Sequence, residues 1–229
     1  SISPDARRGP PLLFLRRPPQ MAAAMSDRPN ILLVYTDQQR YDTLGVNGND
    51  LIRTPNLDAF AEQAVRFTRG YVTTPLCVPS RVATMAGRYG HATGSYNNSR
   101  PIQPRETHLP GLLRSAGYRT ALIGKDHCFG SHAEQAFDVC LHMSHGVIRH
   151  PRNEIERRIN AARDGKMQVP YADDPIPPDE NITATLFREA GDWLEAEDGP
   201  SFCWLSIPDP HPPYMVCEPY ASMYDGVAL

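Results

Sequence analysis

Three short apolar segments, each bounded by polar residues, dominate the hydrophobic pattern of the chain. They are residues 30–36 (NILLVYT), 118–123 (YRTALI) and 201–207 (SFCWLSI). The first is a continuous apolar run, which is typical of a strand buried on both faces of a parallel sheet. Residues 66–72 and 137–141 are weaker candidates for two further strands. The pattern therefore predicts a sheet of several short strands.

Segments with apolar residues at helical spacing separate these strands. We expect helices from Pro55 onward and at residues 79–85, 106–116, 151–164 and 179–197. Thr54 followed by Pro55 is a common way to begin a helix, and Gly87 and Gly117 are suited to end the second and third helices. Strands that alternate with helices predict an α/β fold whose mostly parallel central sheet is flanked by helices.

The composition limits the class of protein. The chain has 229 residues, of which 41% are hydrophobic and 21% are charged, and its net charge is −3. This balance gives no reason to expect binding to nucleic acid or to an anionic membrane, and no apolar run approaches the length of a membrane span. We expect one domain at residues 26–229, preceded by a disordered Arg/Pro-rich tail or upstream sequence at residues 1–25.

The five cysteines form no C-x-x-C pair. That spacing argues against a disulfide framework and against a zinc ribbon. The apolar segment at residues 12–15, which lies between two pairs of arginines, is too short for the core of a secretory signal. Both observations favour a reducing compartment, so we expect a cytoplasmic protein.

Polar residues follow the three main strands at the point where each strand ends. The groups are Asp37-Gln38, Lys125-x-His127 and His211. Ligands of open α/β sheets bind beyond the carboxyl ends of the strands, so we expect these side chains to converge there. Taken singly, each is better explained as a capping acid, a solvated lysine or a loop histidine. Their occurrence at three strand ends favours a common site.

Cys77 begins the segment CVPSR, just before the helix expected at residues 79–85. Cysteine is a poor helix cap compared with Ser, Thr, Asp or Asn. A small buried thiol is its ordinary role. A reactive thiolate is the functional alternative, because a helix N-terminus and Arg81, one turn further on, would lower the pKa of the thiol. The sequence lacks both the longer glycine-rich loop of cysteine-dependent phosphatases and the surroundings of papain-like cysteines.

The segment CVPSR, followed by Gly87-Arg88, resembles the signature of the type I sulfatases of the alkaline phosphatase superfamily. The resemblance extends over residues 28–225 and includes RPNILLVYTDQQRYDTLG, TPNLDAFAEQAVRFTRGYV, GYRTALIGKDH and PHPPY. It implies an alkaline-phosphatase-like fold. Within the family, the chain is most similar to the branch of choline sulfatases and phosphonate monoester hydrolases.

This resemblance implies a sulfuric ester hydrolase whose nucleophile is made from Cys77. A formylglycine-generating maturation enzyme would oxidise the cysteine to an aldehyde, whose hydrate attacks the sulfur of a small sulfate ester and then releases sulfate. A divalent metal would assist, with calcium expected first and magnesium or manganese as alternatives. The resemblance also implies that Asp37, Gln38 and residue 77 bind this metal and that Arg81 steadies the formylglycine.

The same resemblance assigns further residues to the substrate side of the site. Lys125 would bind sulfate and His127 would orient the hydrated aldehyde. His211 would contact sulfate and help to protonate the leaving oxygen. Asn98, in the segment GSYNNSR, matches a substrate-side asparagine of the choline sulfatase and phosphonate hydrolase branch.

Family members continue well beyond this length, and their later half supplies the remaining metal ligands. We therefore expect a truncated, N-terminal portion of a sulfatase domain that is inactive or weakly active alone. The nearest alternative is a phosphonate or phosphate ester hydrolase of the same superfamily, which Asp37-Gln38 favours and Lys125-x-His127 disfavours. A non-catalytic fragment that serves only in binding is the third interpretation, because the metal site lacks half of its ligands.

Overall fold

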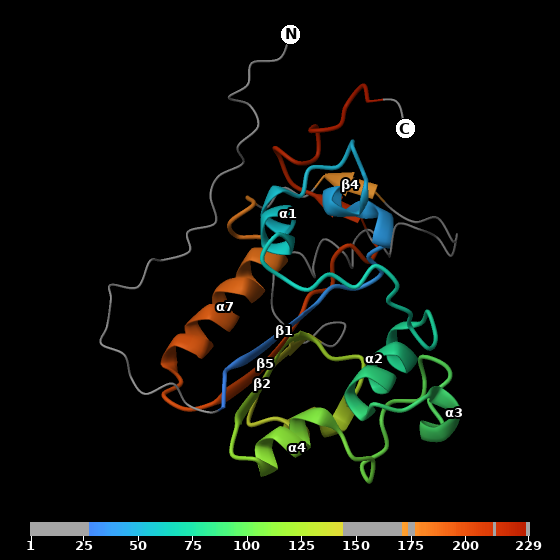
Figure 1. Cartoon of the computed structure of the whole chain (residues 1–229), viewed down its shortest axis with the longest axis vertical. Helices are drawn as coiled ribbons and strands as arrows, with labels where there is room; N and C mark the ends of the chain where they lie inside the picture. The colour runs from blue at the N-terminus through green and yellow to red at the C-terminus, as the bar shows by residue number, and fades with distance from the viewer. Residues whose placement is uncertain (1–27, 144–170, 174–176, 213, 228–229) are drawn as a thin grey trace.

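The computed structural model describes residues 28–143, 171–173, 177–212 and 214–227, which form a parallel sheet with helices on both faces (Figure 1). Four strands make up the sheet, in the order β1-β5-β2-β3. They are β1 (Ile31–Tyr35), β2 (Arg119–Lys125), β3 (Val139–Met143) and β5 (Ser201–Ser206), and every pair is parallel. Strands β4 (Tyr171–Asp173) and β6 (Tyr214–Val216) form a separate parallel pair. The predicted α/β fold with a mostly parallel sheet is confirmed.

Helices lie on both sides of the sheet. Helices α2 (Cys77–Ala86) and α4 (Leu109–Ser115) cover one face and α7 (Ile182–Ala196) covers the other, as Figure 1 shows. The other helical elements of the described residues are α1 (Pro55–Ala61), η2 (Tyr41–Thr43), η3 (Gly45–Asn47), α3 (Gly90–Thr93), η4 (Gly130–His132) and α5 (Ala133–Ala136). Within the described residues, none of the helices is both long and apolar enough to span a membrane.

Strands β2 and β5 carry the core because both of their faces are covered. On the face of α2 and α4, the fully buried Trp204 packs with Phe129. On the face of α7, Leu205 packs with Ile182 and Leu186, which are also fully buried. Burying a side chain of this size stabilises the fold by about 1.5–3 kcal/mol. The two layers therefore fix the carboxyl ends of β2 and β5, where the candidate site lies.

Strand β1 is buried on one face only, which corrects the prediction that both faces are buried. Ile31, Leu33 and Tyr35 pack against the layer of α2, whereas Leu32 and Val34 are 48% and 44% exposed. Helix α7 packs over β5 and β2 and, within the described residues, leaves this face of β1 exposed. A continuous apolar run thus predicts the strand but does not tell what covers its second face.

The prediction of a strand at residues 66–72 is wrong. This segment consists of turn and irregular backbone, and Phe67 and Tyr71 are 81% and 88% exposed. A strand is stable only when a neighbour pairs with its backbone N–H and C=O groups. In the described part of the chain, no strand pairs with residues 66–72.

Helix boundaries differ from the predicted ones by a few residues. Helix α2 begins at Cys77 rather than at Pro79, and it ends as predicted with Gly87 in the left-handed conformation. Helix α7, expected at residues 179–197, begins after Asn181, whose side chain accepts the backbone N–H of the third residue beyond it. The capping side chain thus fixes the first residue of a helix more precisely than the spacing of apolar residues does.

Helix α4 begins at Leu109, later than the predicted start at residue 106. The ring of His108 accepts the N–H of Gly111, and Pro110 lies in the first turn, where a helix tolerates proline. Two further predictions, the tail at residues 1–25 and the helix at residues 151–164, lie outside the described residues.

Candidate active site

The carboxyl ends of three neighbouring strands bring the predicted polar residues together. Tyr35 of β1 and Gly124 of β2 both pair in register with Ser206 of β5, so the residues that follow them meet at one edge of the sheet. Lys125 Nζ lies 2.8 Å from Asp37 Oδ2. The parallel register therefore produces the convergence that the sequence predicts.

Asp37 is the centre of this cluster. Its backbone N–H donates to the carbonyl oxygen of Asp209 at 3.2 Å, and its side chain is only 5% exposed. Both Lys125 Nζ, at 2.8 Å, and Arg81 Nη2, at 2.9 Å, donate to Oδ2. Burial works to raise the pKa of Asp37, but these two cations outweigh it and hold the pKa below its ordinary value of 3.8. Asp37 is therefore ionised at neutral pH.

Arg81 is fully buried and connects three elements of the site. Its Nη1 donates to Ser206 Oγ at 2.6 Å and to the backbone carbonyl of Lys125 at 3.0 Å. Its guanidinium lies over the ring of Tyr35, 5.0 Å from the centroid. From its buried position, Arg81 thus holds Asp37 and the ends of β2 and β5 in place, and it does not present its charge to solvent. Ser206 is not predicted from the sequence, where its only signal is a hydroxyl at the end of an apolar run.

Cys77 is the first residue of α2 and is half-buried. Its Sγ donates to Asp37 Oδ1 at 3.7 Å. Burial is the largest effect on the thiol and raises its pKa, and Asp37 adds to the rise against the opposing charges of Lys125 and Arg81. This is the reverse of the lowered pKa expected from the helix N-terminus and Arg81. The thiol is protonated at neutral pH, which argues against a thiolate nucleophile.

Asn98 reaches the same helix from a distant loop. Its Oδ1 accepts the backbone N–H of Val78 at 3.2 Å, while Leu76, which occupies the N-cap position, contributes no side-chain hydrogen bond. Asn98 is itself exposed to solvent. It therefore lies next to the first turn of the helix that begins at Cys77, and its side-chain oxygen is engaged by that helix.

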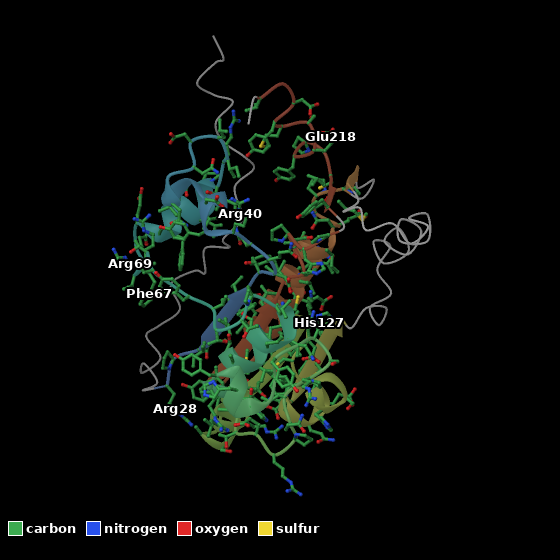
Figure 2. All side chains as sticks on the ribbon, turned by 90° about the vertical axis from the view of Figure 1, so that its right-hand side faces the viewer. Arg28, Arg40, Phe67, Arg69, His127 and Glu218 are labelled. Carbon is green, nitrogen blue, oxygen red and sulfur yellow. The ribbon has the colours of Figure 1, made fainter. Side chains whose placement is uncertain are left out.

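His127 and Gln38 both have a positive φ, of 44° and 61°, which is uncommon outside glycine. Asp126 supports the turn at His127, because its carboxylate accepts the N–H groups of the residues from Cys128 to Gly130. Figure 2 shows His127 near the middle of the molecule, away from Phe67 and Arg69 at its edge. Such backbone strain is common at functional sites.

His211 completes the group around Cys77. Its Nδ1 lies 2.6 Å from the carbonyl oxygen of Pro212, and because a carbonyl only accepts, Nδ1 carries the proton. The ligating atoms of Asp37, Cys77 and His211 all lie within 4.8 Å of one another. These three residues could hold a metal ion, and Asp37 Oδ1 is the carboxylate oxygen that faces residue 77.

Asp209 is a second residue of the site that the sequence does not predict. Its backbone carbonyl holds the N–H of Asp37, and its Oδ2 accepts the hydroxyl of Thr183 from α7 at 2.6 Å. It thereby ties the segment before His211 both to the turn that follows β1 and to the first turn of α7. Its position within PDPHPPY was the only signal in the sequence.

Comparison with known proteins gives consistent matches. A family model described as Sulfatase matches residues 29–228. An ulvan-active sulfatase of Formosa agariphila is 31% identical over 213 residues, which are 88% of this chain and 39% of that protein. Steryl-sulfatase of Homo sapiens is 38% identical over 145 residues, which are 58% of this chain and 24% of that protein.

Among solved structures, the phosphonate monoester hydrolase of Agrobacterium radiobacter is similar, with a TM-score of 0.70 and 26% sequence identity. The match covers 86% of this chain and 44% of that one. The chain therefore spans less than half the length of each of these three proteins.

Proposed function

The chain belongs to the sulfatase family, and from this we propose that its site serves the hydrolysis of small sulfate monoesters after Cys77 has been converted to formylglycine. The observation that carries the proposal is the position of Cys77, at the start of α2 and 3.7 Å from Asp37. A protonated, half-buried thiol is a poor nucleophile but a suitable precursor. A formylglycine-generating maturation enzyme is the partner that this proposal requires.

The residues fit a divalent cation and a hydrated aldehyde. Asp37 Oδ1 faces residue 77, and Gln38 follows Asp37 with a side-chain carbonyl oxygen, so both would hold the cation together with residue 77. When present, the aldehyde hydrate supplies the nucleophilic hydroxyl and the cation supplies positive charge beside it. Calcium is the cation we propose first, because these donors are oxygens.

Charges of this chain prepare the site for an anionic group. The backbone N–H groups at the start of α2 and the ammonium of Lys125 provide positive potential where the sulfate would bind. Lys125 would then share its hydrogen bonds between Asp37 and a sulfate oxygen. Arg81 stays buried and keeps Asp37 ionised and correctly placed.

We infer that His211 transfers a proton to the leaving alcohol. The bond from Nδ1–H to Pro212 leaves Nε2 as the atom that exchanges protons with bound groups. A protonated His211 would donate from Nε2 to the ester oxygen as its bond to sulfur breaks. His127 would orient the hydroxyls of the hydrated aldehyde from the strained turn after β2.

Phosphonate ester hydrolysis is the second candidate, favoured by the similarity to the phosphonate monoester hydrolase. We place it second because the chain has the Lys125-x-His127 pair that the sulfatase resemblance implies. Within the described residues, Asp37, Gln38 and residue 77 would supply only part of the six or more ligands of a hard cation.

The test begins with the protein isolated from a host that has the maturation enzyme. The mass of the tryptic peptide at residues 70–81 reports whether Cys77 has exchanged its thiol for an aldehyde. Rates on an aryl sulfate and on the matching aryl phosphonate are then compared. An unmodified thiol in an active protein would refute the mechanism, and faster cleavage of the phosphonate would favour the second candidate.

A further inference from the structure

The group formed by Asp37, Cys77 and His211 offers a metal ion different ligands before Cys77 is converted to formylglycine than after it. In the thiol form, the three groups that face one another are a sulfur, an imidazole and a carboxylate. We propose that this form binds one Zn²⁺ ion through Cys77 Sγ, His211 Nε2 and Asp37 Oδ1, with the fourth position open to water. The inference concerns the unconverted chain, so it does not rest on the proposed sulfatase activity.

The spacing of the three atoms is close to that of a tetrahedral zinc site. With Zn–S at about 2.3 Å and Zn–O at about 2.0 Å, sulfur and oxygen ligands lie about 3.5 Å apart. Cys77 Sγ and Asp37 Oδ1 are already 3.7 Å apart. One ligating atom from each of the three residues, for His211 a ring nitrogen, lies within 4.8 Å of the other two. Small rotations of these side chains would complete the site.

His211 has the tautomer that a metal ligand requires. Its Nδ1–H donates to the Pro212 carbonyl at 2.6 Å, which leaves the lone pair on Nε2. A hydrogen bond from the second ring nitrogen to a backbone carbonyl is the usual support of a zinc-bound histidine. The ring is thus prepared to bind a metal without a change of tautomer.

Asp37 is supported in the same way. Arg81 Nη2 and Lys125 Nζ both hold Oδ2, so the carboxylate cannot rotate freely and Oδ1 remains directed at Cys77. A ligating carboxylate that is itself hydrogen-bonded is typical of an ordered metal site. Both His211 and Asp37 are thus held in place by hydrogen bonds from atoms that would not bind the metal.

Charge favours zinc on the thiol form over a hard cation. Asp37, Lys125 and Arg81 together carry a net charge of +1 when the thiol is neutral. Zinc binding releases the Cys77 proton to solvent and forms a Zn–S bond, so the net charge rises by one. A calcium ion that leaves the Cys77 thiol protonated would raise the net charge by two beside the same two cations. Sulfur and imidazole are also ligands that zinc prefers and calcium does not.

Conversion of Cys77 would therefore switch the metal preference of the site. It replaces the one sulfur ligand with oxygen and leaves a set suited to a hard cation. Zinc bound before conversion would also cover the thiol that the maturation enzyme has to reach. The thiol form and the converted form are thus expected to select different ions.

The experiment uses the full chain from a host without the maturation enzyme, with the thiol confirmed by peptide mass. Competition against a chromophoric zinc chelator should show one tight equivalent, and Co²⁺ should give thiolate-to-cobalt charge-transfer absorption. Cys77→Ser and His211→Ala should each weaken this site at least as much as the loss of a residue that supports a ligand, which typically costs about 10–100-fold. Cys140→Ser, which removes another half-buried thiol, should bind zinc as the parent does.

Thermal unfolding of each variant checks that it is folded. Alkylation of the unaltered chain provides a test that does not depend on variants: zinc should protect Cys77 in the peptide at residues 70–81, but not Cys140. Equal zinc affinity in the parent and in Cys77→Ser, or a cobalt spectrum that survives His211→Ala, would overturn the proposal. So would alkylation of Cys77 at the same rate with and without zinc.

Discussion

Asn98 caps the helix that carries Cys77, because its Oδ1 accepts the N–H of Val78 at 3.2 Å. The helix begins after Leu76, whose side chain offers no acceptor of its own. A residue twenty positions downstream thus supplies the cap that the local sequence lacks. This bond therefore couples the loop that contains Asn98 to the orientation of the Cys77 side chain at the start of the helix.

Replacing Asn98 by alanine should lower the free energy of unfolding by about 1 kcal/mol, the usual cost of losing an N-cap acceptor. Asn98→Asp keeps an acceptor at the same place and should stay near the parent. Chemical denaturation of the three proteins measures both changes. A stability equal to the parent in Asn98→Ala would mean that water replaces the cap at no cost.

Arg81→Met should destabilise the protein by about 3–5 kcal/mol, because removing one partner of a buried ion pair leaves Asp37 poorly compensated. The matched control is Arg88→Ala, which breaks an ion pair with Glu106 whose arginine is 49% exposed. Such a surface pair contributes about 0–1 kcal/mol. Denaturation of both variants at one pH compares them, and similar losses would show that the burial of Arg81 has no energetic consequence.

The stability contributed by Asp37 should depend on pH. Because its pKa is lower in the folded than in the unfolded chain, the contribution is fully present above the unfolded pKa of about 3.9 and is lost as the pH falls through the folded value. The gap in unfolding free energy between the parent and Asp37→Asn should therefore be largest near neutral pH and shrink below about pH 4. Denaturation curves across this range measure it.

The control for this pH dependence is Asp42→Asn, which removes a carboxylate whose side chain is 60% exposed. It should change the stability by less than about 0.5 kcal/mol. A gap for Asp37→Asn that stays constant with pH would contradict the lowered pKa of Asp37.

The strand ends of the candidate site were predictable because each apolar run stops sharply at a polar residue. Asp37, Lys125 and His211 follow such runs, and the parallel register then brings them together. Ser206 and Asp209 were not predictable in the same way. Their importance comes from Arg81 and Asp37, which reach them across the fold rather than along the chain.

The sequence also does not reveal how deeply each residue is buried. The pKa of Cys77 was expected to fall because of its neighbours, yet desolvation outweighs them. Two further predictions failed for the same reason. Residues 66–72 have no neighbouring strand to pair with, and no helix of the described residues covers the second face of β1. Local pattern predicts an element's shape, whereas burial depends on neighbours that are distant in sequence.

Cys77 should react slowly with iodoacetamide at pH 8 in the presence of a chelator, although it is only half-buried. Its pKa is raised first by burial and further by Asp37, so little thiolate is present. Asp37→Asn removes the negative charge, lowers the pKa and should speed the reaction. The rate is measured by peptide mass, and Cys140, whose pKa burial raises to about 11, is the internal reference. A slower reaction in Asp37→Asn would show that Asp37 acts as a base toward the thiol.

Leu205→Ala and Leu32→Ala remove the same side chain from neighbouring strands of the sheet. Leu205 is fully buried under α7, so its loss should cost about 2–5 kcal/mol. Leu32 is 48% exposed on the same face, and its loss should cost less than about 1 kcal/mol. Denaturation of the two variants measures the difference. If Leu32→Ala proves as costly as Leu205→Ala, the outer face of β1 is covered in solution, and a second apolar layer contributes to the stability of the site.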